Sequence, residues 1–212
     1  MTKGIFITAT GTDAGKTYIS ALIVKKMRES GFNCGYYKPA LSGDVYPNDC
    51  EYVLKTAGIE DDAKDFVSYK FKPALSPHLA SQKENTQIIL GKIIEDFNRI
   101  QKSYDYVLVE GAGGIVCPFG DNLLLEDVIK NLGLDIIIVA PSGLGSINST
   151  VLTVEYARSH GINVKGIIMN NFDNSEMHID NKKMIEKLTG LKVLTTVKTG
   201  DKEICIKEIK WI

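Results

Sequence analysis

The sequence lacks an excess of either charge and lacks any paired cysteine motif. Its 212 residues include 25 lysines and arginines against 26 aspartates and glutamates, for a net charge of -1. A nucleic-acid-binding domain usually carries a basic excess, so this balance argues against nucleic acid as a partner. The four cysteines (34, 50, 117 and 205) form no C-x-x-C pair, which argues against a zinc site or a redox dithiol. Scattered single cysteines are typical of reduced, cytoplasmic proteins, and we expect that location.

Long apolar runs, internal repeats and low-complexity linkers are also missing. The longest apolar runs fall well short of the roughly 20 residues that a membrane helix needs, so we expect no membrane association. Residues 1–3 lead directly into the first apolar run, and we expect no signal peptide. Hydrophobic residues make up 44% and charged residues 24% of the chain, which is ordinary for a globular protein. We therefore expect one domain spanning residues 1–212.

A phosphate-binding pattern lies close to the start of the chain. Residues 5–7 are a short apolar run typical of a buried strand, and the turn-rich segment 10–15 follows it. Gly15, Lys16 and Thr17 then open an apolar helical pattern. This order is the P-loop arrangement, although Thr10 stands where the strict pattern has glycine. The unpaired N–H groups and the dipole of a helix start attract polyphosphate.

Apolar runs alternate with helical patterns along the rest of the chain. The runs are apolar on both faces, which predicts a mostly parallel sheet with helices on both sides, a P-loop NTPase-like α/β fold. We expect strands at 5–7, 34–37, 66–71, 106–109, 136–139, 164–169 and from 193. We expect helices from 15, from about 49 and from 76, and over 85–102, 123–132, 146–160, 177–188 and 204–209.

Four polar residues follow the predicted strands and should meet at one edge of the sheet. Pro39 cannot continue a central ladder, so we expect Lys38 at the end of its strand. Lys16, Glu110 and Asn170 occupy similar positions after other strands. Ligands of open α/β sheets bind at the carboxyl ends of the strands. The sequence thus predicts a nucleotide site at that edge, with magnesium held near Glu110.

Several motifs together resemble the dethiobiotin synthetase family. Residues 9–17 (ATGTDAGKT) resemble its G-T-D-T-x-V-G-K-T loop, and residues 37–43 (YKPALSG) resemble its Y-K-P-x-x-S-G. Residues 109–114 (VEGAGG) match its V-E-G-A-G-G, and residues 76–78 and 166–170 match in place and order. The resemblance covers nearly the whole chain and fades after about Leu194.

The resemblance implies an ATP-dependent ring closure in biotin biosynthesis. In that family 7,8-diaminononanoate takes up CO2 as a carbamate, ATP phosphorylates the carbamate, and the second amine closes the cyclic urea of dethiobiotin. ADP and phosphate leave. The cofactor is Mg²⁺, and the family acts as a homodimer with its substrate near the subunit interface.

The resemblance also implies a role for each matching residue. Lys16 and Lys38 would be catalytic, and Thr17, Asp49 and Glu110 would hold magnesium. Thr12, Lys38 and Ser42 would bind the substrate. The nucleotide would be bound by Asp13, Ala14, Gly15, Lys16, Thr17, Tyr18, Asp49, Glu110, Gly111, Ala112, Gly113, Asn170 and Asn171.

The chain departs from the family pattern at two places. Ala9, Gly11 and Ala14 replace the family's glycine, aspartate and valine in the phosphate loop. Residues 196–199 (TVKT) replace a proline-bearing segment on the adenine side. We expect weaker adenine contacts there and looser nucleotide selectivity as a result.

Three other functions remain as alternatives. One is another P-loop amide-forming ligase, although such enzymes usually need a glutaminase unit, and we find no cysteine–histidine pattern for one. A second is an ATP-driven dimerisation switch of the partition or septum-placement type, which carries a second lysine at the position of Gly11. The third is a nucleotide-binding module without catalysis.

Overall fold

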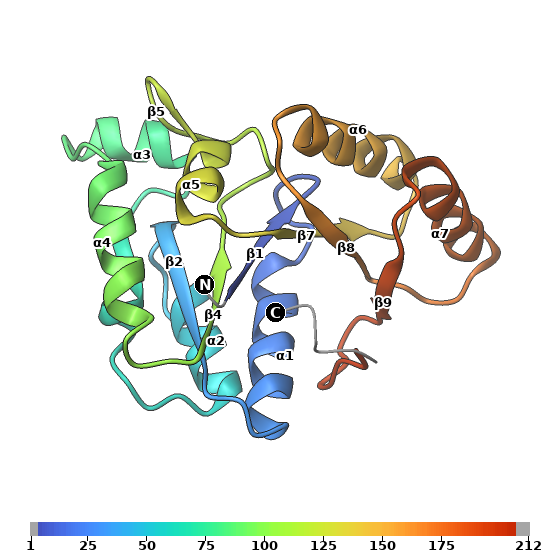
Figure 1. Ribbon diagram of the computed structural model, residues 1–212, viewed down its shortest axis with the longest axis horizontal. Helices are drawn as coiled ribbons and strands as arrows, with labels where there is room; N and C mark the ends of the chain where they lie inside the picture. The colour runs from blue at the N-terminus through green and yellow to red at the C-terminus, as the bar shows by residue number, and fades with distance from the viewer. Residues whose placement is uncertain (1–3, 207–212) are drawn as a thin grey trace.

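The protein is built around one seven-stranded sheet in which every neighbouring pair of strands is parallel (Figure 1). The computed structural model describes residues 4–206. The strand order is β3-β2-β4-β1-β7-β8-β9. These strands are β1 Gly4–Ala9, β2 Cys34–Ser42, β3 Val67–Phe71, β4 Tyr106–Glu110, β7 Ile136–Pro141, β8 Val164–Asn170 and β9 Val193–Val197.

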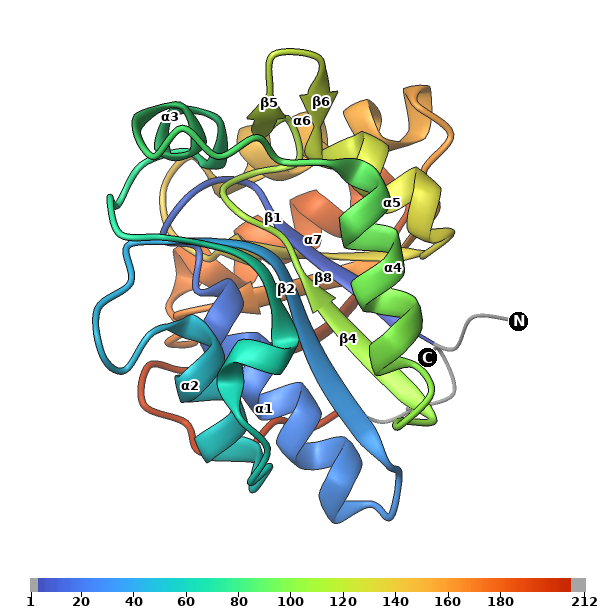
Figure 2. The same ribbon diagram turned by 90° about the vertical axis from the view of Figure 1, so that its left-hand side faces the viewer.

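Helices cover both faces of this sheet (Figures 1 and 2). The α1 and α2 helices pack together on one face, and the opposite face carries α4 to α7. Right-handed crossovers between parallel strands produce this division, because the chain winds toward opposite edges of the sheet in its two halves. The helices are α1 Lys16–Glu29, α2 Asp49–Ala57, η1 Ala63–Phe66, α3 Pro77–Lys83, α4 Leu90–Ile100, α5 Leu125–Leu132, α6 Ser146–Ser159 and α7 Glu176–Thr189.

The apolar runs of the sequence form the core, as the predicted fold class requires. Residues 5–7 of β1 and 136–140 of β7 are fully buried, with 0% exposure throughout. A strand with helices on both sides must be apolar on both faces, which is why these runs are continuous and do not alternate. The predicted parallel α/β fold is confirmed.

Strand β2 is longer than predicted and runs through Pro39 to Ser42. It pairs with β4 as far as Tyr37 and with β3 from Lys38 onward. Pro39 therefore lies beyond the last residue that pairs with β4, and its missing N–H breaks no bond there. Lys38 consequently lies inside the strand, and our placement of it at the strand end was wrong.

Other boundaries also differ from the predictions. The α4 helix begins at Leu90 and not at 85, where Asn85 has a left-handed, non-helical backbone (φ 49°). A small hairpin, β5 Pro118–Gly120 with β6 Leu123–Leu124, was not predicted. Of the helix expected at 204–209, residues 204–206 are not helical and the rest lie outside the described residues.

Strand β1 lies between β4 and β7, so the loop that follows it opens at the middle of the carboxyl edge. After β9 the chain returns to α1, where Lys25 Nζ donates to the carbonyl of Lys202 at 3.0 Å. Within residues 4–206, no helix combines the length and apolar character that crossing a bilayer would require.

Candidate nucleotide and phosphoryl-transfer site

The loop between β1 and α1 leaves the start of α1 open to an anion. Gly15 is the N-cap, with a left-handed backbone (φ 93°), and no described side chain caps the helix. The helix start at Asp49, by contrast, is closed by a capping box between Asn48 and Glu51. Because the first N–H groups of a helix need acceptors, the bare start of α1 is suited to phosphate.

Asn170 holds this loop in place from the end of β8. Its Nδ2 donates to the carbonyl of Ala14 at 3.0 Å. A Cβ on Gly15 would lie 2.0 Å from that Nδ2, so only glycine fits beside the amide. The other atom of the amide, Oδ1, is buried and has no hydrogen-bond partner among residues 4–206. A buried acceptor of this kind is suited to an amino group on a ligand.

Further hydrogen bonds hold the backbone of Asn170 in place. Its carbonyl accepts from Ser142 Oγ at 2.8 Å. Asn181 of α7 donates in turn to the carbonyls of Ser142 at 2.9 Å and Gly143 at 3.1 Å. The phosphate loop is thus tied to β8 and α7 by a continuous buried network.

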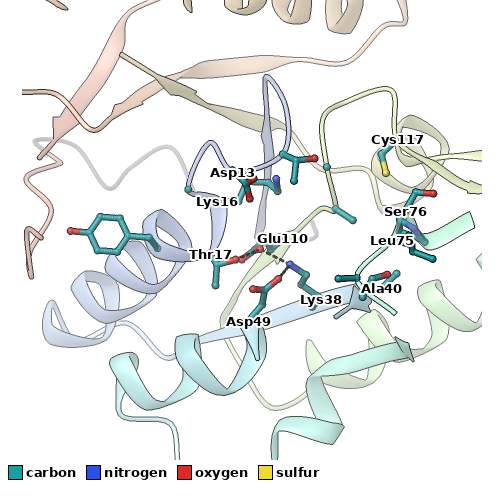
Figure 3. A pocket seen from close by; sticks show the side chains of 18 residues that line it. Asp13, Lys16, Thr17, Lys38, Ala40, Asp49, Leu75, Ser76, Glu110 and Cys117 are labelled. Carbon is teal, nitrogen blue, oxygen red and sulfur yellow. Dashed lines mark hydrogen bonds and ion pairs between the residues drawn. The ribbon is translucent and has the colours of Figure 1, made fainter. Parts of the chain in front are cut away.

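A cavity of about 750 Å³ opens beside the loop (Figure 3). Its lining comes from the phosphate loop, β2, the start of α2, the end of β4 and residues 74–77. The lining is Thr12, Asp13, Gly15, Lys16, Thr17, Tyr18, Lys38, Ala40, Ser42, Asp49, Ala74, Leu75, Ser76, Pro77, Glu110, Ala112, Gly113 and Cys117.

Lys38 lies between two carboxylates in this cavity (Figure 3). Its Nζ is 2.5 Å from Asp49 Oδ2 and 2.6 Å from Glu110 Oε1. Thr17 Oγ1 donates to the same Glu110 oxygen at 2.8 Å. The second oxygen, Oε2, accepts from the hydroxyl of Tyr36 at 2.9 Å. Glu110 is fully buried and Lys38 is 3% exposed, so removing either charge would leave the other buried and uncompensated.

Secondary structure fixes each member of this cluster. Glu110 is the last residue of β4, and its strand neighbour β2 brings Tyr36 and Lys38 to the same side, two residues apart. The capping box at Asn48 sets the start of α2 and so places Asp49 in its first turn. Charges from β2, α2 and β4 meet because these elements share the carboxyl edge.

The surroundings shift the pKa values of three of these groups. Burial tends to lower the pKa of Lys38, but Glu110 and Asp49 overcome it and hold the pKa above its ordinary value. Burial tends to raise the pKa of Asp49, but Lys38 lowers it below the ordinary value. For Lys16, burial lowers the pKa below its ordinary value, although the negative charge of Glu110 opposes this change. The Lys38–Asp49 pair is thus charged at neutral pH.

Most of the predicted site residues meet at this cavity. The exceptions are Ala14, Gly111, Asn170 and Asn171, which are not part of its lining. Asn170 contacts the phosphate loop, and Asn171 Oδ1 accepts from Thr199 Oγ1 at 3.0 Å. Gly111 lies against Phe6 and Leu125, where a Cβ would come within 3.0 Å of each. The binding roles of all these residues remain predictions.

Sequence reasoning missed Tyr36 and Cys117. The signal for Tyr36 was available, because residues two apart on a strand share a face and Lys38 was already a candidate. Cys117 follows the glycines at 113 and 114 and lines the cavity, and burial raises the pKa of its thiol to about 11. A single cysteine gives no motif, so the sequence offered no comparable signal for it.

Several solved structures share this fold. A ParA family ATPase from Chlorobium tepidum TLS is 16% identical, with a TM-score of 0.57 over 93% of this chain and 84% of that one. The septum site-determining protein MinD complexed with Mg-ADP, from Pyrococcus horikoshii OT3, is 17% identical with a TM-score of 0.58, over 93% and 82%. At these identities the likeness establishes the P-loop fold alone.

Sequence relatives are much more similar. A family model described as AAA domain matches residues 3–202. ATP-dependent dethiobiotin synthetase BioD of Clostridium botulinum (strain Eklund 17B / Type B) is 50% identical, covering 99% of this chain and 97% of that relative. The protein of the same name from Brachyspira hyodysenteriae (strain ATCC 49526 / WA1) is 48% identical, covering 99% and 98%. The chain therefore belongs to the ATP-dependent dethiobiotin synthetase family.

Proposed function

We propose that this chain converts 7,8-diaminononanoate, CO2 and ATP into dethiobiotin, ADP and phosphate. The name that its relatives carry supports this reaction. The observation that carries the proposal is a single cavity into which the open start of α1, two lysines and two carboxylates all project. The dimerisation-switch alternative has less support, because Gly11 stands where such switches carry a lysine.

We assign the two lysines to the reacting groups. One amine takes up CO2 as a carbamate and gives up a proton. A carbamate oxygen then attacks the γ-phosphorus of ATP and ADP leaves. The second amine attacks the carbamoyl carbon, loses a proton and expels phosphate. Lys16 and Lys38 would offset the negative charge that develops in these steps. Holding the reactants side by side would supply much of the acceleration.

The remaining site residues would bind and orient the substrates. The N–H groups at residues 13–18 would hold the phosphates, together with the small residues 111–113. Thr12 and Ser42 would contact the carbamate or amine end of the substrate. Ser42 Oγ is buried without a hydrogen-bond partner among the described residues, which supports a contact with a ligand. Asn170 and Asn171 would bind the base.

Magnesium fits the donors at the centre of the cavity. Thr17, Asp49 and Glu110 offer a hydroxyl and two carboxylates, which are the hard oxygen ligands that Mg²⁺ prefers. No three His, Cys, Asp or Glu side chains cluster as a metal site anywhere in residues 4–206. The protein would therefore supply only part of the coordination, and the phosphates of ATP would supply more. The ion would neutralise phosphate charge during transfer.

We also propose a cytoplasmic homodimer. Leu144 is 96% exposed just before α6, and Leu152 on that helix is 61% exposed, which supports a contact with a second chain. Cys34, Cys50 and Cys117 are buried free thiols, which supports a reducing compartment. Light scattering coupled to size-exclusion chromatography would measure the oligomeric state.

A direct assay tests the proposed reaction. The protein is incubated with 7,8-diaminononanoate, bicarbonate, ATP and Mg²⁺, and dethiobiotin is measured by mass spectrometry. We expect dethiobiotin and ADP in equal amounts, and none of either product when the diamine is omitted. ATP consumption without dethiobiotin would contradict the proposal.

A further inference from the structure

The two lysines of the cavity have different partners. Lys38 Nζ donates to Asp49 and to Glu110, at 2.5 and 2.6 Å. Lys16 Nζ has a long hydrogen bond of 3.4 Å to the carbonyl of Gly11. In this structure, therefore, Lys38 is engaged with carboxylates, whereas Lys16 lies beside the phosphate loop and forms no ion pair with a described carboxylate.

The partners of Lys38 are also the oxygens that we assign to magnesium. Glu110 Oε1 accepts both from Lys38 Nζ and from Thr17 Oγ1, while Oε2 accepts from Tyr36. Both oxygens of this fully buried carboxylate are thus already in use. An ammonium and a divalent cation repel each other strongly at such short range, so they do not share Glu110 Oε1.

We propose that Lys38 takes the place of the metal ion at Asp49 and Glu110 as long as no nucleotide is bound; we call this its stand-in role. It neutralises Asp49 and Glu110 until magnesium and nucleotide arrive, and it then leaves these carboxylates for the anionic groups that arrive with them. The proposal rests on the magnesium assignment above. It explains how the protein tolerates the buried Glu110 carboxylate before magnesium and nucleotide bind, since a buried carboxylate without an opposite charge is strongly destabilising.

One consequence is that metal alone binds poorly. Without nucleotide, a metal ion would have to displace Lys38 from both Asp49 and Glu110, and the one other carboxylate that lines the cavity belongs to Asp13 of the phosphate loop. With nucleotide, the phosphates give Lys38 a new partner. The loss of one ion pair is then matched by the gain of another, and Lys38 makes metal binding depend on nucleotide.

Metal binding by variants without nucleotide tests this directly. Free Mn²⁺ is measured by electron paramagnetic resonance with wild type, Lys38→Met and Lys16→Met. Both substitutions remove one positive charge from the same cavity, but only Lys38→Met frees the carboxylates. We expect Lys38→Met to bind Mn²⁺ at least about tenfold more tightly than wild type, and Lys16→Met to change affinity less than about threefold.

A second measurement covers the case in which Lys38→Met is poorly stable. Mn²⁺ should raise its Tm more than it raises that of wild type, because a ligand that binds the folded state stabilises it. Equal tightening in both variants, or none in either, would overturn the proposal. The dethiobiotin assay separates the two ideas: wild type that makes dethiobiotin, with no affinity gain in Lys38→Met, would refute the stand-in role alone.

Discussion

The two ends of the proposed nucleotide site are built from different chemistry. At the phosphate end, Lys38 and Glu110 are buried charges joined at 2.6 Å, beside the bare helix start. At the other end, the proposed base-side rim of Tyr18, Asn170, Asn171 and residues 198–201 offers amides, hydroxyls and carbonyls beside the side chains of Lys198 and Asp201, and all of it except Asn170 is half-buried or exposed. Hydrogen bonds to buried charged groups are stronger than hydrogen bonds to neutral groups, and most of the rim is in contact with water. We infer that the phosphates supply most of the recognition and the base supplies little.

The largest effect should come from the lysines. We expect Lys16→Ala and Lys38→Ala each to lower kcat at least about a hundredfold, as removal of one transition-state donor does. Steady-state dethiobiotin formation measures this, with Lys55→Ala on the exposed side of α2 as a control of unchanged rate. Full activity in Lys38→Ala would show that its assigned role is wrong.

Gly15→Ala should damage the phosphate end without removing charge. Its Cβ would lie 2.0 Å from Asn170 Nδ2, and its φ of 93° is strained for any other residue. We expect strain of about 1 to 3 kcal/mol and ATP affinity weakened roughly tenfold or more, measured by calorimetry.

The matched control for that change is Gly91→Ala. Gly91 lies in α4 with open space around it, so the added methyl group should stabilise the protein by up to about 1 kcal/mol. If Gly15→Ala bound ATP as tightly as Gly91→Ala did, the tight fit of the loop against Asn170 would not matter for ATP binding.

Nucleotide selectivity tests the base-side rim. We expect ATP, GTP and CTP to bind with affinities within about tenfold of one another, because a missing contact to a neutral group changes binding by about 1 kcal/mol. Competition against a labelled ATP analogue gives the three values. A preference for ATP of several orders of magnitude would mean that the rim recognises adenine tightly.

The smallest effect should come from Tyr18→Phe. The hydroxyl of Tyr18 donates to the carbonyls of Lys198 and Asp201 and so fastens the chain after β9 to α1. Burial and Asp201 raise the pKa of Tyr18, which keeps this donor protonated near neutral pH. Its loss should lower the free energy of unfolding by about 1 kcal/mol and leave kcat nearly unchanged. A hundredfold fall in kcat would show that Tyr18 acts on the reacting groups and does not only belong to the base-side rim.

The phosphate loop and the fold class could be predicted because their signals are local. An apolar run followed by Gly15-Lys16-Thr17 and a helical pattern specifies strand, loop and helix within about 25 residues. The order of the sheet was not predicted, since pairing depends on contacts between distant segments.

The charged cluster shows the same limit at the level of single residues. The sequence marks Lys38 and Glu110 as candidates, but their contact depends on the register of β2 against β4, set by packing across 72 positions of the chain. The sequence also did not show that β2 changes its pairing partner from β4 to β3 near Pro39, because a proline argues against a strand at its own position.

The central place of β1 in the sheet has a consequence for how the protein is made. Its neighbours β4 and β7 begin at Tyr106 and Ile136, so half of the chain must leave the ribosome before β1 can pair on either side. The strand that leads into the phosphate loop is thus synthesised about 100 residues before the nearer of its two neighbours, β4, and its pairing is strongly non-local. During that interval its apolar residues are exposed, and exposed apolar strands are prone to aggregate.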